Sequence, residues 1–246
     1  MDRIVPYLWF DQEAGDAVDF YVGLFEDSGV LIEQNLEDTP SGENTVNFSF
    51  KLAGQHFGAI NGGPFFKLNR SISLTILGKT TEEIQELWDK LAENGQILVP
   101  LRKHSFSEFY GWVEDKFGVS WHLVSTEGND YEQEIIPTLL FAGENIGKAK
   151  EAMHYYTDIF HNGEIVDEYY FEEGMAEHPK AELMHGLFKL MGVGLAAMDD
   201  MDQNDFDFNE AFSLMVMCET QGEIDYYWDK LSAVAEAEQC GWLKDK

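Results

Sequence analysis

The side chains of this chain that could do chemistry are seven histidines, two cysteines and a series of polar residues on predicted strands. His122 lies in the run VSWHLV and His56 in the run HFGAI, so both are predicted on strands of the first half of the chain. They are the only weak candidates for metal ligands, because the other histidines show no metal-ligand spacing. A tight divalent site needs three or more competent ligands. The sequence therefore predicts no metal site and no cofactor.

Nucleophilic and cofactor-binding motifs are also missing. Cys218 lies in the apolar run LMVMCE, which is typical of a buried, inert thiol. Cys218 and Cys240 form neither a disulfide framework nor a C-x-x-C clip. The glycines at 192–194 indicate a turn between strands, not a cofactor loop, and no Walker loop, G-x-S-x-G elbow or H-E-x-x-H motif occurs. The sequence therefore assigns no catalytic residue.

A polar sheet face is the feature that most resembles a binding site. The run TVNFSFKL (45–52) alternates between apolar and polar residues, which indicates a strand with one buried face. Small hydroxyls and amides beside aromatic rings suit a cavity for a neutral or weakly polar organic molecule. A sheet face filled by its own side chains explains the same residues equally well. The cavity candidates are Tyr7, Trp9, Asn47, Ser49, Ser73, Thr75 and His122.

These candidates belong to the first of two similar copies within the chain. Residues 48–61 match 186–199, residues 71–91 match 211–231, and GWVEDK (111–116) matches GWLKDK (241–246). Similar blocks in the same order indicate a duplication. We predict a first domain at 1–127 and a second domain at 135–246, connected through the polar run TEGNDYEQE.

Both copies predict an α+β architecture. Thr80 and Glu83 fit a capping box at the start of a helix, and Thr220 and Glu223 repeat it in the second copy. The buried stripes of the two helices are predicted to be Ile84, Leu87, Trp88 and Leu91, and then Ile224, Tyr227, Trp228 and Leu231. A hairpin around 116–118 closes the first copy. The alternating strands predict a curved sheet, with helices on its apolar side and a concave polar face.

The second copy stops at Lys246, where the first copy continues into a final strand. We therefore expect the second copy to lack its last strand and to leave a sheet edge that another chain or the first copy covers. Any functional pocket is expected in the first copy, which is complete to Val124.

The net charge of −30, from 46 acidic and 16 basic residues, makes nucleic acid or an anionic membrane an improbable partner. A solvated acidic surface is the simplest interpretation, and it tolerates a neutral or cationic ligand. The N-terminus has no signal-peptide plan, and no apolar run approaches the length of about 18 residues that a spanning helix needs. A soluble, cytoplasmic protein is therefore expected.

Several runs resemble one family: PYLWFD, NGGP, FSEFYGWVEDKFGVSW, DFNEAFS, YYWDKLS and QCGWLKDK. They are similar to the PhnB-like branch of the vicinal oxygen chelate (glyoxalase/bleomycin-resistance/dioxygenase) superfamily, a branch often labelled 3-demethylubiquinone-9 3-methyltransferase. The resemblance covers residues 4–125 and 135–246 and implies a tandem fold of βαβββ modules. Metal-using relatives take their ligands from the first and last strands of each half. Those positions here offer Pro6 or Tyr7 and His122, so the resemblance implies no metal site.

The resemblance leaves three functional hypotheses. The first, which we favour, is metal-free binding of a small organic molecule in a cavity of the first domain, as in the bleomycin-resistance relatives. The second is an enzyme, either a metal-dependent lyase, isomerase or dioxygenase, or the labelled methyltransferase. In the third, copy two is a structural partner, so that intramolecular pairing of the two domains replaces a homodimer.

Overall fold

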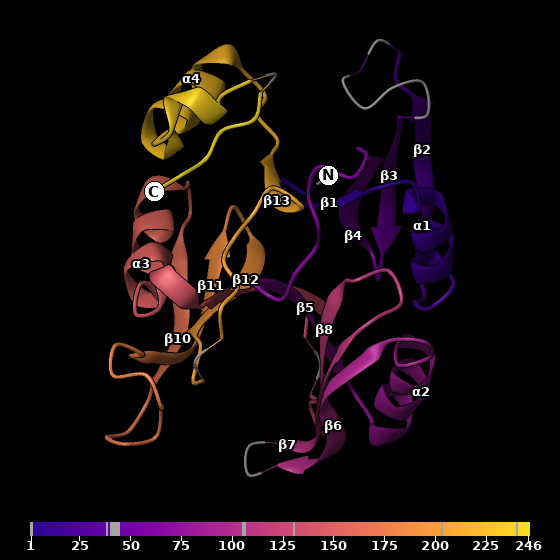
Figure 1. The fold of residues 1–246 in the computed structure, drawn as a ribbon, viewed down its shortest axis with the longest axis vertical. Helices are drawn as coiled ribbons and strands as arrows, with labels where there is room; N and C mark the ends of the chain where they lie inside the picture. Colours follow the sequence, from indigo (N-terminus) through magenta and orange to yellow (C-terminus); the bar gives the residue numbers. More distant parts are fainter. Residues whose placement is uncertain are drawn as a thin grey trace.

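The computed structural model describes residues 2–37, 39, 45–104, 107–129, 131–202, 204–239 and 241–246. These residues form a five-stranded sheet, an eight-stranded sheet and four α-helices (Figure 1). The strand orders are β13-β1-β4-β3-β2 and β10-β11-β12-β9-β5-β8-β7-β6. The predicted α+β class is confirmed. No helix in the described ranges is long and apolar enough to cross a membrane.

Four units follow one another along the chain, and each begins with a strand and a helix. Unit 1 contains β1 (Ile4–Phe10), α1 (Ala14–Val22), β2 (Gly29–Asn35), β3 (Val46–Leu52) and β4 (Gln55–Asn61). Unit 2 contains β5 (Ile72–Gly78), α2 (Thr81–Leu91), β6 (Gln96–His104), β7 (Ser107–Glu114) and β8 (Ser120–Ser125). Unit 3 contains β9 (Ile135–Phe141), α3 (Ala149–Ile159), β10 (Glu164–Tyr170), β11 (Leu183–Leu190) and β12 (Val193–Asp199). Unit 4 contains β13 (Phe212–Val216) and α4 (Gln221–Leu231), and no later strand among its described residues.

Each sheet combines strands from both copies. β1 pairs antiparallel with β13, placing Tyr7 opposite Ser213. β5 pairs antiparallel with β9, placing Ser73 opposite Thr138. Units 1 and 4 therefore share the five-stranded sheet, and units 2 and 3 share the eight-stranded sheet (Figure 1). The intramolecular pairing considered above is the arrangement found.

The helix caps repeat between the copies as predicted. Thr80 Oγ1 accepts a hydrogen bond from the Glu83 N–H at 3.2 Å, and Thr220 Oγ1 accepts one from the Glu223 N–H at 3.3 Å. The carboxylates of the two glutamates also accept hydrogen bonds. Glu83 Oε2 accepts from the N–H of Lys79, and Glu223 Oε2 accepts from the N–H of Glu219. These bonds satisfy donors that a helix start leaves free, so both helices begin at the predicted position.

The apolar stripe of α2 is buried as predicted: Ile84, Leu87, Trp88 and Leu91 are between 0 and 7% exposed. α2 packs against β7 and β8. A Cβ added at Gly111 of β7 would come within 2.5 Å of the Trp88 ring, so this indole lies directly on the strand backbone. The absence of a side chain at Gly111 is what allows this approach.

The matching prediction for α4 is wrong in part. Tyr227 and Leu231 are buried, but Ile224 is 44% exposed and Trp228 is only half-buried. α2 is covered by β7 and β8, whereas the described residues contain no equivalent strands over α4. β13 pairs with β1 along one edge, and within the described ranges no strand pairs with its other edge. That the second edge is covered by another chain or by copy one therefore stays a prediction.

Candidate functional site

The seven cavity candidates lie on two different sheets. Each sheet has one face covered by helices and one face free of them, and the alternation of the strands places the candidates on the helix-free faces. The tyrosine face, on the five-stranded sheet, carries Tyr7, Trp9, Asn47 and Ser49. The histidine face, on the eight-stranded sheet, carries Ser73, Thr75 and His122. The structure therefore does not bring the seven residues together into one cavity.

On the tyrosine face, the aromatic rings lie flat on the sheet. A Cβ at Gly58 would come within 2.3 Å of the Tyr7 ring, and one at Gly62 would come within 2.2 Å of the Trp9 ring. The Tyr7 hydroxyl is hydrogen-bonded to Asn47 Oδ1, and burial raises the pKa of Tyr7 to about 12. The rings of Tyr7 and Trp9 therefore cover the sheet surface beside which they were expected to line a cavity.

Further contacts hold these rings in place. Trp9 Nε1 donates to the Gly63 carbonyl at 2.8 Å, and the Trp9 ring meets Phe66 edge to face at 5.1 Å. Trp242, from the C-terminal segment, meets Tyr7 edge to face at 5.8 Å. The Tyr7 hydroxyl and the Trp9 N–H are therefore already paired within the protein.

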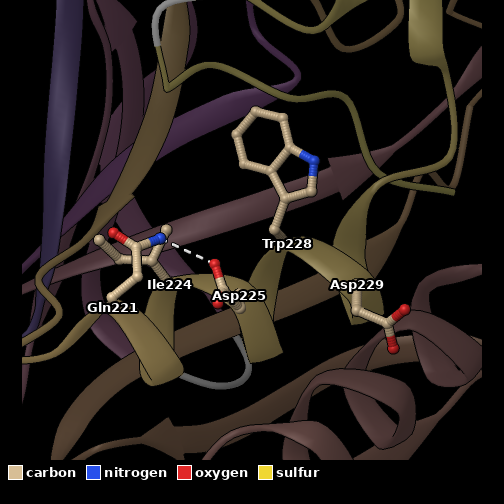
Figure 2. Close-up of a pocket in the computed structure, with 5 residues that line it drawn as sticks. All are labelled: Gln221, Ile224, Asp225, Trp228 and Asp229. Carbon is tan, nitrogen blue, oxygen red and sulfur yellow. Dashed lines mark hydrogen bonds between the residues drawn. The ribbon is translucent and has the colours of Figure 1, made fainter.

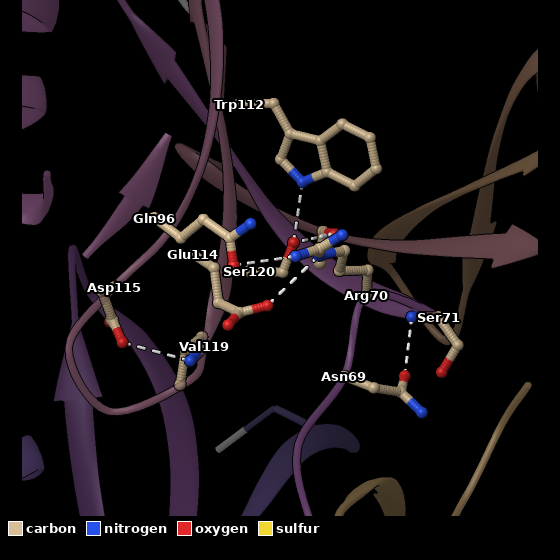
Figure 3. Close-up of polar contacts among 10 residues, drawn as sticks. Asn69, Arg70, Ser71, Gln96, Trp112, Glu114, Asp115, Val119 and Ser120 are labelled. Carbon is tan, nitrogen blue, oxygen red and sulfur yellow. Dashed lines mark hydrogen bonds and ion pairs between the residues drawn. The ribbon is translucent and has the colours of Figure 1, made fainter. Parts of the chain in front are cut away.

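On the histidine face, hydroxyl groups join neighbouring strands. Ser73 Oγ and Ser120 Oγ lie 2.7 Å apart. Trp112 Nε1 donates to Ser120 Oγ at 2.8 Å (Figure 3). Thr75 Oγ1 and Thr138 Oγ1 lie 2.7 Å apart across the β5–β9 pair, which joins copy one to copy two. The boundary between the two copies, where β5 pairs with β9, therefore lies within the histidine face.

His122 is the centre of an aromatic stack on this face. Its ring lies 4.9 Å from the Trp112 ring and 5.9 Å from the Tyr110 ring, nearly parallel to both. His122 Nδ1 is hydrogen-bonded to the Tyr110 hydroxyl at 2.9 Å. The side chain is buried, and its Nε2 has no hydrogen-bond partner in the described part of the chain. A buried polar atom without a partner is rare in native proteins.

The surroundings keep His122 uncharged. Burial, followed by the positive charge of His185, lowers the pKa of His122 to about 3. His185 lies on β11 of copy two, and burial lowers its pKa as well, opposed by the charge of Asp167. Burial also raises the pKa of Tyr110 to about 12. Burial therefore favours the uncharged forms of His122, His185 and Tyr110, and the histidine face is formed by both copies.

The remaining candidates lie elsewhere. His56 is on β4, bonded to Asp2 Oδ2 at 3.1 Å, and so is on a different sheet from His122. Among the described residues, no group of three or more His, Cys, Asp or Glu could hold a metal ion. Cys218 is a half-buried free thiol, and burial raises its pKa, which disfavours the nucleophilic thiolate. Cys240 lies outside the described residues.

Sequence reasoning missed four residues of the histidine face: Tyr110, Trp112, Thr138 and His185. Tyr110 and Trp112 alternate with Gly111 and Val113, so the strand period could have placed them beside His122. Thr138 and His185 belong to copy two. Only the pairing of β5 with β9 brings them to this face, and the sequence pattern does not specify that pairing.

A family model described as 3-demethylubiquinone-9 3-methyltransferase matches residues 2–124 and 133–246. The chain belongs to this family. The two matched segments correspond to the two copies, so the family model describes one copy and this member carries it twice. None of the curated proteins matches the chain.

Solved structures show which known folds this chain is similar to. A Bacillus cereus PhnB protein, described as a proposed 3-demethylubiquinone-9 3-methyltransferase, is 36% identical over 51% of this chain and 100% of its own, with a TM-score of 0.48. A glyoxalase I mutant from Zea mays is 9% identical over 86% of this chain and 72% of its own, with a TM-score of 0.53. At that identity, the likeness shows the fold alone. The fold is the vicinal oxygen chelate fold, as the sequence resemblance implied.

Proposed function

We propose that this PhnB-like protein binds a small, uncharged organic molecule on the histidine face without using a metal. One observation carries the proposal: His122 Nε2 is buried and has no hydrogen-bond partner in the described residues. Leaving a buried polar atom unpaired costs about 1–3 kcal/mol, and a ligand atom that pairs with Nε2 would recover this energy. The site would draw on both copies, because Thr138 and His185 share the face.

The chemistry of the face indicates the class of ligand. When the Tyr110 hydroxyl donates to Nδ1, the neutral imidazole carries its proton on Nε2 and donates it to an acceptor. A carbonyl, ether or hydroxyl oxygen on an otherwise apolar molecule suits that donor and the aromatic rings beside it. Nucleic acid is disfavoured as a partner by the net charge of −30. Two cysteines in 246 residues fit a cytoplasmic location.

Native mass spectrometry of protein purified without added metal tests the proposal. We expect one organic adduct per chain in the wild type and in His154→Gln, a change at an exposed histidine. His122→Phe, which keeps an aromatic ring but removes Nε2, is expected to lose the adduct. One divalent ion per chain in place of an organic molecule would contradict the proposal.

If the purified protein is bare, a thermal-shift screen of uncharged, oxygen-bearing compounds follows. Compounds that stabilise the wild type and not His122→Phe would support the proposal, and equal stabilisation of both would count against it. The alternative function is an enzyme, either a metal-dependent lyase, isomerase or dioxygenase, or the methyltransferase that the family description names. Turnover that is lost on chelation, or that depends on a methyl donor, would favour that alternative.

A further inference from the structure

β2 forms one edge of the five-stranded sheet, on the outer side of β3 (Figure 1). It pairs antiparallel with β3, and no strand of the described ranges pairs with its other side. Its residues from Val30 to Asn35 are all exposed. The main-chain N–H and C=O groups that point away from β3 are therefore accessible to an added strand.

The apolar side chains of β2 are those of a strand that is usually covered. Val30, Leu31 and Ile32 follow one another and are between 43 and 56% exposed. Val30 lies opposite Phe50, whose side chain is in the core. Ile32 lies opposite Ser49 of the tyrosine face, so apolar groups lie on both faces of this edge. Continuous apolar runs are typical of strands that are buried on both faces.

The equivalent strands of units 2 and 3 are protected against such pairing. β6 and β10, like β2, follow the helix of their unit and form sheet edges. β6 contains Pro100 and two basic residues, Arg102 and Lys103, and its pairing with β7 has three irregularities. β10 contains three acidic residues, and its pairing with β11 has two irregularities. β2 has one irregularity, no proline and one charged residue, Glu33. Since charges, proline and bulges are what keep a further strand away from an edge, β2 is the least protected of the three.

The surroundings of β2 are acidic. Residues 4–50 contain ten aspartates and glutamates and no lysine, arginine or histidine. The pairing with β3 brings one basic residue, Lys51, to the start of β2. Four exposed carboxylates lie within or next to the strand, and none of them forms an ion pair within the described ranges: Glu26, Asp27, Glu33 and Glu37. A second copy of this chain would bring the same carboxylates to the edge, whereas a basic segment would meet opposite charges.

We propose that β2 binds an extended, basic segment of a partner polypeptide as an added strand, antiparallel to β2. The main chain of the segment bonds the accessible edge, and its apolar side chains cover Val30 and Ile32. Its lysine or arginine residues lie beside the carboxylates near the two ends of β2. Addition of a strand to a sheet edge is a common mode of peptide recognition, in which main-chain bonds give affinity and side chains give specificity. β2 and the histidine face belong to different sheets, so this interaction is independent of the proposed small-molecule site.

Binding of a designed peptide to the full chain tests the proposal. The probe is fluorescein-labelled KKVTIVTVKK, a strand-forming sequence with two lysines at each end. The comparison peptide EEVTIVTVEE reverses the charge of the ends. A second comparison peptide, KKVTPPTVKK, has proline at its two central positions and so loses main-chain donors on both edges. Fluorescence anisotropy is expected to show saturable binding of the probe, at least about tenfold tighter than that of either comparison peptide.

Matched variants of the protein locate the binding. Ile32→Lys is expected to weaken probe binding by about tenfold or more, because it removes an apolar contact and places a positive charge beside the lysines of the probe. Ile97→Lys makes the same change at a 51% exposed isoleucine of β6, on the other sheet, and is expected to leave binding unchanged.

A third variant tests whether the probe binds any surface that is both apolar and acidic. α4 has a shallow hollow of that kind, lined by Gln221, Ile224, Asp225, Trp228 and Asp229 (Figure 2). Ile224→Lys changes this hollow and is expected to leave binding unchanged. Ile32, Ile97 and Ile224 are all exposed, so the three variants are expected to fold, which circular dichroism verifies.

Four results would overturn the proposal. They are failure of the probe to bind, equal binding of the probe and either comparison peptide, equal effects of Ile32→Lys and Ile97→Lys, and loss of binding in Ile224→Lys alone. Sedimentation of the protein without peptide supplies a further check. A stable dimer that Ile32→Lys dissociates would assign the edge of β2 to a second copy and would also overturn the proposal.

Discussion

Tyr21 and Asp115 form a buried pair in which the tyrosine hydroxyl donates to the carboxylate at 2.7 Å. The same carboxylate accepts bonds from Trp121 Nε1 at 2.8 Å and from the Phe117 and Val119 N–H groups at 2.8 and 3.1 Å. Burial raises the pKa of Asp115, and these four bonds oppose that effect. The pair ties α1 of unit 1 to the β7–β8 turn of unit 2, so it joins two units whose strands belong to different sheets.

Tyr21→Phe is expected to lower the free energy of unfolding by about 2 kcal/mol, because it removes one hydrogen bond to a buried carboxylate. Urea unfolding followed by circular dichroism measures this change. Tyr156→Phe removes the equivalent bond to Asp245 in copy two, where both residues are less buried, and is expected to cost less. Equal losses for the two variants would contradict the view that burial sets the strength of these bonds.

The lowered pKa of His122 predicts that the stability of the protein depends on pH. Its pKa is lowered from 6.5 to about 3 in the folded protein, so between these values the unfolded chain binds a proton that the folded chain does not. The contribution of the neutral imidazole to the free energy of unfolding is therefore fully present above pH 6.5. It is lost as the pH falls below that value, at about 1 kcal/mol per pH unit.

The difference between wild type and His122→Phe isolates this contribution from the titration of the many carboxylates. From pH 7 to pH 5, the free energy of unfolding of the wild type is expected to fall more steeply than that of His122→Phe. His154→Gln, at an exposed histidine, serves as the control. Parallel pH profiles for wild type and His122→Phe would show that the imidazole is not held neutral by the fold.

The two equivalent helices predict unequal effects of the same substitution. Ile84 of α2 is fully buried, so Ile84→Ala is expected to cost about 2–5 kcal/mol of stability. Ile224 of α4 is 44% exposed, and Ile224→Ala is expected to cost less than about 1 kcal/mol, because little apolar surface is lost. Chemical denaturation of both variants measures the difference. A large loss at Ile224 would mean that this side chain is more buried in solution than its 44% exposure indicates.

Much of the local structure follows from the sequence. The caps at Thr80 and Thr220 and the stripe of α2 were predictable because capping and helical period are local signals. The turn at Ala53–Gly54, between β3 and β4, is equally local, and both residues have positive φ angles, 47° and 77°. The buried face of β3 follows from its clean alternation of apolar and polar residues.

Other features required the tertiary structure. No local pattern marks the edge strands β2, β6 and β10, since they are largely exposed and have no clear alternation of apolar and polar residues. No local sequence pattern predicts the pairing of β1 with β13 or of β5 with β9. This pairing divides the cavity candidates between two sheets, so the composition of the candidate site depended on contacts that only the folded chain reveals.

The bond between Thr75 and Thr138 provides a direct measure of how strongly the copies are coupled on the histidine face. The two hydroxyls lie 2.7 Å apart, Thr138 is 1% exposed, and the bond crosses from β5 to β9. Thr75→Val and Thr138→Val each keep the shape of the side chain and leave one hydroxyl without this partner. Each single variant is expected to lose about 1–2 kcal/mol, but the double variant less than the sum, because replacing both partners removes the unpaired group. A double-mutant cycle by urea unfolding is expected to give a coupling energy of about 0.5–1 kcal/mol.

Ser73→Ala and Ser120→Ala form the matched cycle within copy one, where the hydroxyls are also 2.7 Å apart. Additive losses in the Thr75–Thr138 cycle alone would show that the copies are not coupled through this bond.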